Sequence, residues 1–142
     1  NHHFEKNVVE IIEKYAVNPA LLRFELTESM FYADLNQSIK TMQTLIEFGI
    51  QFSMDDFGTG YSSLSYLRLL PLDQLKIDRS FMAGMLSNPE DLAVIKTIIA
   101  LAKILGLTVV AEGIESEAQF LLLKESGCYL FQGYYFGYPS KF

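Results

Sequence analysis

The sequence predicts an α/β fold built on a parallel sheet of about five β/α units. Segments whose apolar residues have helical spacing alternate with short apolar runs that are typical of strands. Strands that alternate with helices in this way form βαβ units, whose strands lie parallel in one sheet. The 142 residues suffice for one hydrophobic core, and half of them are apolar, as expected for a globular chain.

The N-terminal part predicts two helices, each followed by a strand. Apolar residues at helical spacing indicate a helix over residues 4–15, and a strand follows over residues 21–29. A second helix is expected over residues 36–48, with Gly49 closing its C-terminus. Alternating apolar residues then indicate a strand over residues 50–57.

The remaining part continues the alternation with clearer helix boundaries. Asn88 or Ser87 caps the longest helix at its N-terminus, and Gly106 closes it. Ser116 and Gln119 have the spacing of a capping box at the start of the next helix. The expected elements are a helix over 62–70, a strand over 73–78, a helix over 88–105, a strand over 107–115, a helix over 116–127 and a strand over 129–137.

Composition and charge exclude several classes of partner. The net charge of −6 would repel duplex nucleic acid, and no local basic patch compensates for it. No apolar run reaches the roughly 18 residues of a membrane span, so we expect no membrane segment in this chain. Cys128 is the single cysteine, which excludes an intrachain disulfide and fits a small core residue in a reducing compartment. We expect a cytoplasmic location, either free or within a larger membrane-attached protein.

Polar residues stand at the C-terminal end of every predicted strand. Right-handed crossovers place these ends on one side of a parallel sheet, and β/α barrel enzymes build their active sites there. Asp55 and Asp56 are the most prominent, because two adjacent acids end an apolar strand directly before a glycine-containing turn. The other positions are Glu25 and Glu28, Lys76 and Asp78, Glu112 and Glu115, and Gln132.

This set of side chains indicates a metal site. Carboxylate oxygens suit hard cations such as Mg²⁺, Mn²⁺ or Ca²⁺. Each position alone also has an ordinary structural interpretation, as a solvated or helix-capping residue, a surface ion pair or a partner for loop backbone. The pair of Asp55 and Asp56 is harder to explain in this way, because a turn needs neither both charges nor a buried strand before it. The coincidence of all these positions favours a metal-dependent α/β enzyme, with two ions that could share a carboxylate.

At these same residues the sequence resembles the EAL family of cyclic-di-GMP phosphodiesterases. The resemblance covers nearly the whole chain from about residue 4, and its motifs are highly specific when taken together. It implies a TIM-type (β/α) barrel that uses two Mg²⁺ or Mn²⁺ ions to hydrolyse cyclic-di-GMP to linear pGpG in bacterial second-messenger signalling. The matching stretches are ELTES (25–29), DDFGTGYSSLSYL (55–67), LKIDRSF (75–81), VVAEGIE (109–115) and QGYYFGYP (132–139).

The resemblance implies metal-binding roles for four carboxylates. Glu25 and Asp55 would be metal ligands, and Asp55 would bridge both ions. Asp56 would hold the second ion, and Glu112 would hold metal directly or through water.

The resemblance also implies roles in catalysis and substrate support. Lys76 would position the nucleophilic water or help to deprotonate it, and Gln132 would orient that water or the phosphate. Asp78 would orient Lys76 or contact the ligand. In the family, movement of the loop after the paired aspartates couples to dimer contacts. The residues of this loop and the two acids that would steady it are Gly58, Thr59, Gly60, Glu28 and Glu115.

The chain departs from the family pattern in its length. A complete β/α barrel has eight strands and about 250 residues, whereas this sequence predicts five strands. The strand with the namesake Glu-Ala-Leu motif is absent, and so is the next strand, whose asparagine is also a metal ligand in the family. We therefore interpret residues 1–142 as the C-terminal part of an EAL phosphodiesterase domain, a partial barrel whose N-terminal strands are missing.

Two functions stay open at this point. The retained residues favour a phosphodiesterase in the complete domain, with the isolated chain inactive. The alternative is a degenerate EAL module that binds cyclic-di-GMP or a protein partner without turnover. Attached sensor or diguanylate-cyclase domains are compatible with either.

Five parallel strands cannot close a barrel, so we expect open edges and poorly covered apolar side chains at Phe52, Val109 and Val110. We therefore expect a homodimer or other self-association.

Overall fold

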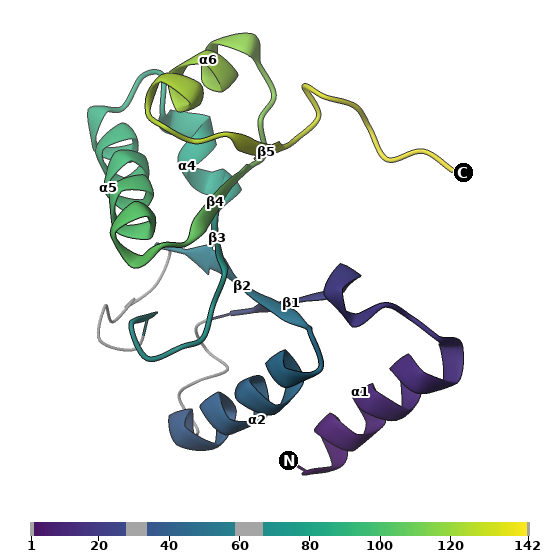
Figure 1. Cartoon of the computed structure of the whole chain (residues 1–142). Coiled ribbons are helices and arrows are strands. Elements are labelled where there is room, and N and C mark those ends of the chain that lie inside the picture. Colours follow the sequence, from purple (N-terminus) through teal and green to yellow (C-terminus); the bar gives the residue numbers. More distant parts are fainter. Residues whose placement is uncertain (1, 28–33, 59–66, 142) are drawn as a thin grey trace.

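The computed structural model of the protein describes residues 2–27, 34–58 and 67–141. Their strands form one sheet in the order β1-β2-β3-β4-β5, so strands that follow one another in the chain are neighbours (Figure 1). Each neighbouring pair is parallel, which confirms the predicted succession of β/α units. The strands are β1 (Arg23–Leu26), β2 (Gln51–Phe57), β3 (Gln74–Ile77), β4 (Thr108–Glu112) and β5 (Leu130–Gln132).

Helices connect the strands and pack beside them. In Figure 1 α1 and α2 lie below, beside β1 and β2, and α4, α5 and α6 lie above, beside β3, β4 and β5. Within the described ranges, no helix combines the length and the apolarity that a membrane crossing requires. The helices are α1 (His2–Tyr15), the short 3₁₀ helix η1 (Pro19–Leu21), α2 (Leu35–Glu47), α4 (Arg79–Gly84), α5 (Pro89–Leu105) and α6 (Glu117–Glu125).

The predicted helix boundaries of α5 and α6 are confirmed by their caps. The side chain of Asn88 accepts a hydrogen bond from the backbone N–H of Glu90 at the start of α5. Gly106 ends that helix with a φ of +71°, a left-handed conformation that glycine adopts without strain. Ser116 and Gln119 form the expected capping box, with both reciprocal hydrogen bonds present.

Alternate strand residues give the sheet an apolar face and a polar face. Phe52 and Leu75 are buried under the helices, at 3% and 0% exposure, and the Phe24 ring packs edge-on against Phe52 at 5.8 Å. The opposite face is polar, whereas the interior of a β/α barrel is ordinarily filled by branched apolar side chains. Strand alternation and register place on this face Arg23, Glu25, Gln51, Ser53, Asp55, Gln74, Lys76, Thr108, Glu112 and Gln132, together with the apolar Val110 and Leu130.

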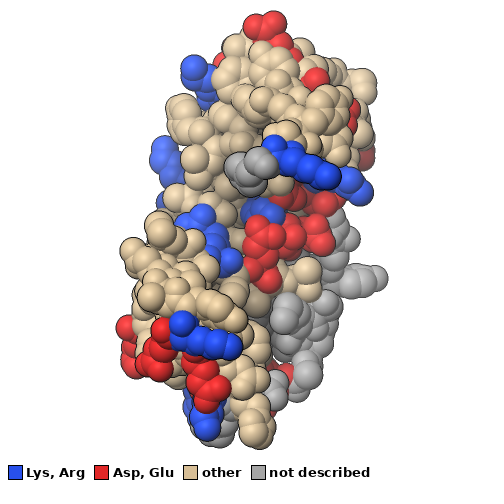
Figure 2. All heavy atoms as spheres, turned by 90° about the vertical axis from the view of Figure 1, so that its right-hand side faces the viewer, with Lys and Arg blue, Asp and Glu red and all other residues tan. Residues whose placement is uncertain are grey.

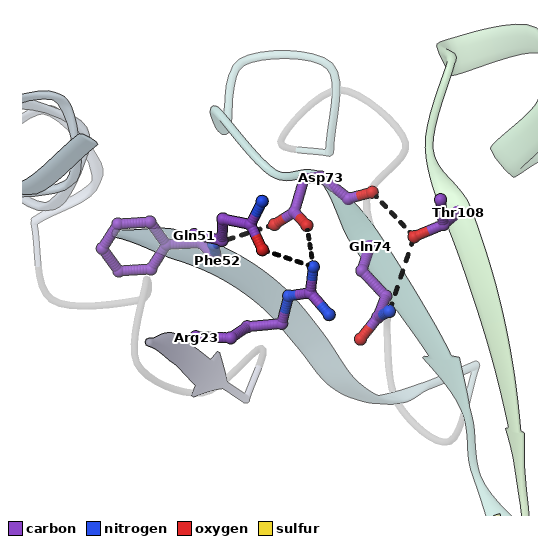
Figure 3. Close-up of polar contacts among 6 residues, drawn as sticks. All are labelled: Arg23, Gln51, Phe52, Asp73, Gln74 and Thr108. Carbon is purple, nitrogen blue, oxygen red and sulfur yellow. Dashed lines mark hydrogen bonds and ion pairs between the residues drawn. The ribbon is translucent and has the colours of Figure 1, made fainter. Parts of the chain in front are cut away.

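A polar network ties the N-terminal ends of the strands together (Figure 3). Arg23 Nη2 donates to Gln51 Oε1 and to Asp73 Oδ2, both at 2.6 Å. Asp73 Oδ1 accepts the backbone N–H of Phe52 at 2.9 Å, and the Asp73 carbonyl accepts the hydroxyl of Thr108 at 3.1 Å. The loop residue Asp73 therefore fixes the register of β1, β2 and β4 around β3.

The last strand is shorter than predicted. The sequence predicted one strand over residues 129–137, but β5 ends at Gln132. Gly133 lies against the loop after β4, where an added Cβ would come within 2.2 Å of the Ile114 backbone. Tyr135 then donates its N–H to the Ile114 carbonyl at 2.9 Å, so the chain turns instead of extending.

Two further expectations need correction. The sequence did not predict α4, because a helix of six residues is too short to show apolar periodicity. The expectation that Phe52 lacks covering was wrong, since it points to the helix-covered face, while Val109 and Val110 are half-buried. Most of the helix predicted over residues 62–70 lies outside the described residues.

Candidate active site

Lys76 lies inside an acidic cluster at the C-terminal end of the sheet. Its Nζ is 2.6 Å from Glu112 Oε1, 2.7 Å from Glu25 Oε1 and 3.6 Å from Asp55 Oδ1. The Lys76 side chain is 7% exposed, whereas that of Glu25 is 51% exposed, so the carboxylates reach from a buried ammonium towards solvent. Figure 2 shows acidic side chains gathered at the middle of one face, with basic side chains beside them.

The strands bring these side chains together from four positions in the sequence. Glu25, Asp55 and Glu112 end β1, β2 and β4, and Lys76 stands on β3 between them. The register between β2 and β3 shifts after Met54, and this irregularity lies at the paired aspartates. The predicted convergence of strand-end residues is thus present for these four side chains.

The turn at the paired aspartates has an unusual backbone. Asp56 has a φ of +53°, a left-handed conformation that aspartate tolerates better than most residues. Its N–H donates to the Asp55 carboxylate at 3.0 Å. Gly58 follows with a φ of +96°, and an added Cβ there would lie 3.2 Å from Ile98 Cδ1 and 3.3 Å from the Phe81 ring. Positive φ and close packing both favour glycine at this position.

Asp56 and Asp78 form a hydrogen-bonded carboxyl pair. Burial and the charges of Asp55 and Asp78 raise the pKa of Asp56, although Lys76 opposes this. Burial raises the pKa of Asp78, but hydrogen bonds from Ser80 and Asp56 lower it more, so its net shift is downward. The two carboxyl groups thus have pKa shifts of opposite direction, and Asp78 also accepts the backbone N–H of Ser80 as the N-cap of α4.

The acidic neighbours of Lys76 keep its side chain protonated. Burial lowers the pKa of Lys76, but hydrogen bonds to Glu112 and Glu25 and the charge of Asp55 raise it more, above its ordinary value of 10.5. At neutral pH the side chain is therefore a hydrogen-bond donor. In this arrangement it can orient an oxygen but cannot accept a proton.

The chemistry of these donors fits hard divalent cations. Glu25, Asp55 and Glu112 share one ammonium, so negative charge exceeds positive charge at the site. Their oxygens are the ligands that Mg²⁺ and Mn²⁺ prefer. In the part of the chain that the structure describes, no three histidine, cysteine or acidic side chains converge as a preformed metal site. The Lys76 ammonium lies between the carboxylates that would have to converge.

The remaining predicted residues lie around this centre. Gln132 is exposed and stands directly opposite Glu112 in the register of β5 and β4. Glu115 is exposed, and its N–H donates to Gln119 Oε1 at the start of α6. Within the described ranges the Asp78 carboxylate is hydrogen-bonded with Ser80, Asp56 and the Arg79 backbone, so its orienting of Lys76 stays a prediction. Glu28, Thr59 and Gly60 lie outside the described residues.

Gly113 is a supporting residue that the sequence analysis did not single out. Its φ is +72°, and an added Cβ would come within 2.6 Å of Arg79 Cβ. The loop after β4 therefore packs closely on the first residue of α4, which fixes Glu112 relative to Asp78. A glycine directly after a strand-end glutamate was the available signal.

Comparison with known proteins decides the family. The sequence model of the EAL domain matches residues 1–139. The chain belongs to the EAL domain family. A relative from Pseudomonas aeruginosa, cyclic di-GMP phosphodiesterase NbdA, is 44% identical over 128 residues, which are 90% of this chain and 16% of that protein.

Solved EAL structures share the fold of this EAL chain. A PaMucR phosphodiesterase in complex with c-di-GMP is 40% identical with a TM-score of 0.89, over 94% of this chain and 54% of the other. Klebsiella pneumoniae BlrP1, solved as a manganese and cyclic-di-GMP complex, is 29% identical with a TM-score of 0.81, over 90% of this chain and 33% of that one. The chain thus spans less than two thirds of each of these proteins. The predicted family and the β/α-barrel architecture are confirmed.

Proposed function

We propose that this chain is part of a domain that hydrolyses cyclic-di-GMP to linear pGpG by attack of water on phosphorus. The observation that carries the proposal is the contact of Lys76 with Glu25, Asp55 and Glu112 in a chain of the EAL family. A relative named as a cyclic di-GMP phosphodiesterase and a neighbour solved with c-di-GMP support the substrate.

Four carboxylates would hold two divalent cations, Mg²⁺ or Mn²⁺. Glu25, Asp56 and Glu112 would each hold metal, and Asp55 would bridge both ions. When bound, such ions polarise a phosphoryl oxygen and lower the pKa of water. The excess of negative charge around Lys76 supports this assignment, because a doubly anionic ligand would otherwise be repelled.

The protein's own side chains would orient the reacting groups. Lys76 is a protonated donor whose ammonium would orient the attacking water or a phosphate oxygen. Gln132 lies opposite Glu112 and is exposed, so its amide would reach the same region. The hydrogen bond between Asp56 and Asp78 would hold the paired-aspartate turn on α4. Glu28 and Glu115 would steady the loop of Gly58, Thr59 and Gly60.

A product assay on the full-length protein tests this function. We expect cyclic-di-GMP to be converted to pGpG with Mg²⁺ or Mn²⁺ and to remain intact in EDTA. Chromatography would follow the product, and calorimetry would measure ligand binding separately. Binding without any pGpG in the presence of either metal would contradict the proposal and support a degenerate module that binds without turnover.

We also propose that residues 1–142 alone are inactive and self-associate. β1 and β5 are the edges of the described sheet, and parallel edges present unpaired backbone groups to other chains. Exposed aromatic side chains beside β5, including Tyr129 at 71% and Phe136 at 53%, add to this tendency. Sedimentation of purified 1–142 and a pGpG assay test both statements. A compact monomer at micromolar concentration, or metal-dependent pGpG release, would refute the corresponding one.

The surroundings of the domain belong to the same proposal. Attached sensor or diguanylate-cyclase domains would fit relatives of which this chain spans only 16%. The free thiol of Cys128 is buried at 1% exposure, which supports a reducing, cytoplasmic setting.

A further inference from the structure

We infer that Lys76 is an internal counter-cation that holds the metal-binding carboxylates together before metal binds, and that metal loading displaces it from them. This inference rests on the proposed function, because it concerns the residues assigned there to the two cations.

The contacts of Lys76 join it to several strands at once. One ammonium lies within 4 Å of carboxylate oxygens from three different strands, at 2.6 Å for Glu112 and 2.7 Å for Glu25. The Lys76 side chain is 7% exposed, unlike the helical pair of Lys6 and Glu10, which lie 3.8 Å apart at 74% and 60% exposure. Lys76 is therefore built into the sheet and does not resemble a surface ion pair.

Negative charge exceeds positive charge around Lys76. Three carboxylates gathered around one ammonium repel one another, and the ammonium lowers that repulsion for all three. Without Lys76, Glu25 and Glu112 would carry uncompensated charge on either side of the central strands. In the metal-free protein we therefore expect Lys76 to stabilise the fold and to hold the carboxylates near their final positions.

Lys76 and a divalent cation would compete for the same oxygens. A divalent cation bound by Glu25, Asp55 and Glu112 would take oxygens that now contact Lys76 Nζ. The ammonium and a metal ion cannot both occupy the space between these oxygens, so the ammonium must give up at least some of its contacts. Metal loading would thereby release the lysine ammonium to face the water or phosphate, which links loading of the site to its catalytic readiness.

The test compares Lys76→Met with wild type and with Lys103→Met in the full-length protein. Lys103 is an exposed lysine of α5, so Lys103→Met controls for the loss of one positive charge. Thermal unfolding in EDTA measures the metal-free fold. Calorimetric titration with MnCl₂, without substrate, measures metal affinity.

We expect Lys76→Met to lower the unfolding midpoint in EDTA by at least about 4 °C and Lys103→Met to leave it unchanged. We also expect Lys76→Met to bind Mn²⁺ at least about tenfold more tightly than wild type, because no ammonium has to be displaced. If Lys76→Met is unfolded in EDTA, added MnCl₂ should restore its fold. Failure of MnCl₂ to do so, or a folded variant with unchanged or weaker Mn²⁺ binding, would overturn the inference.

A second variant separates a charge effect from lost packing. Adding Glu112→Gln to Lys76→Met removes one uncompensated carboxylate and should recover part of the midpoint in EDTA. A double variant less stable than Lys76→Met would contradict the counter-cation role.

A different result would refute the proposed function. Wild type that binds no Mn²⁺ would refute the metal site itself. Wild type that binds Mn²⁺ no more weakly than Lys76→Met would refute only the competition.

Discussion

The two ends of the parallel sheet differ in how far their charged side chains neutralise one another. At the N-terminal ends of the strands, Arg23 pairs with Asp73 at 2.6 Å, and the same carboxylate accepts the backbone N–H of Phe52 (Figure 3). At the C-terminal ends, one ammonium on Lys76 faces three carboxylates, and Asp56 shares a hydrogen bond with Asp78. The first end is balanced, and the second carries an excess of negative charge.

This difference distinguishes a network that stabilises the sheet from the cluster that we propose to be functional. A balanced pair that also satisfies backbone groups stabilises strand register, and losing it exposes unsatisfied donors. An excess of like charge costs stability unless a ligand compensates for it, and such strain is typical of functional sites. Variants at the two ends should therefore change different measurements.

The largest expected effect is on turnover in Asp55→Ala of the full-length protein. This variant removes the carboxylate that would bridge both cations, so pGpG formation should fall by at least about 10³-fold. The unfolding midpoint in EDTA should not fall in proportion, because a like charge is removed from the cluster. Asp56→Asn should reduce turnover nearly as much. Hydrolysis near the wild-type rate in Asp55→Ala would exclude the two-metal assignment.

A second prediction concerns Lys76→Ala under saturating metal. If this side chain orients the reacting groups as proposed, kcat should fall by about 10²-fold or more with a smaller change in Kd. Rate measurements at saturating substrate and separate calorimetry with cyclic-di-GMP would distinguish the two. Equal losses in kcat and affinity would contradict the role given to this lysine.

The sequence predicted which residues stand at the C-terminal end of the sheet, because this depends on where each strand ends. Glu25, Asp55, Lys76 and Glu112 were placed at strand ends by local pattern, and their contacts follow from the parallel order of the strands. Helix caps such as Asn88 were predictable for the same reason, since they act within a few residues.

Contacts that depend on register or on tertiary packing could not be predicted. The Arg23–Asp73 pair joins residues 50 positions apart and exists only in one register of β1, β2 and β3. The hydrogen bond between Asp56 and Asp78 depends on the shifted register after Met54 and on the unpredicted helix α4. Which of many strand-end acids touch Lys76 is likewise a property of the folded sheet.

The balanced end should respond in stability and not in chemistry. Asp73→Ala removes the side-chain acceptor of the Phe52 N–H and leaves Arg23 with Gln51 but without its carboxylate partner, so the free energy of unfolding should fall by about 1–3 kcal/mol. Asp73→Asn keeps an acceptor for the backbone and should lose less. Chemical denaturation would measure both, and kcat per folded molecule should stay unchanged. A large loss of kcat in folded Asp73→Ala would show that the two ends are not separable.

The smallest effect is a pH dependence that differs in sign between Asp56 and Asp78. The folded-state pKa of Asp56 is raised above 3.8, so the contribution of this acid to stability is present below pH 3.8 and lost as pH rises through the raised value. Asn at this position imitates the protonated form. In EDTA, Asp56→Asn should therefore match wild type near pH 3 and become slightly more stable than wild type towards pH 7.

The pKa of Asp78 is lowered, so the contribution of Asp78 is present above pH 3.8 and lost as pH falls through the lowered value. Asp78→Asn should accordingly be less stable than wild type near pH 7, and the gap should close as pH falls below 3.8. Unfolding midpoints of the three proteins from pH 3 to 8 would measure both trends. Parallel curves for the two variants would contradict the opposite pKa shifts of Asp56 and Asp78.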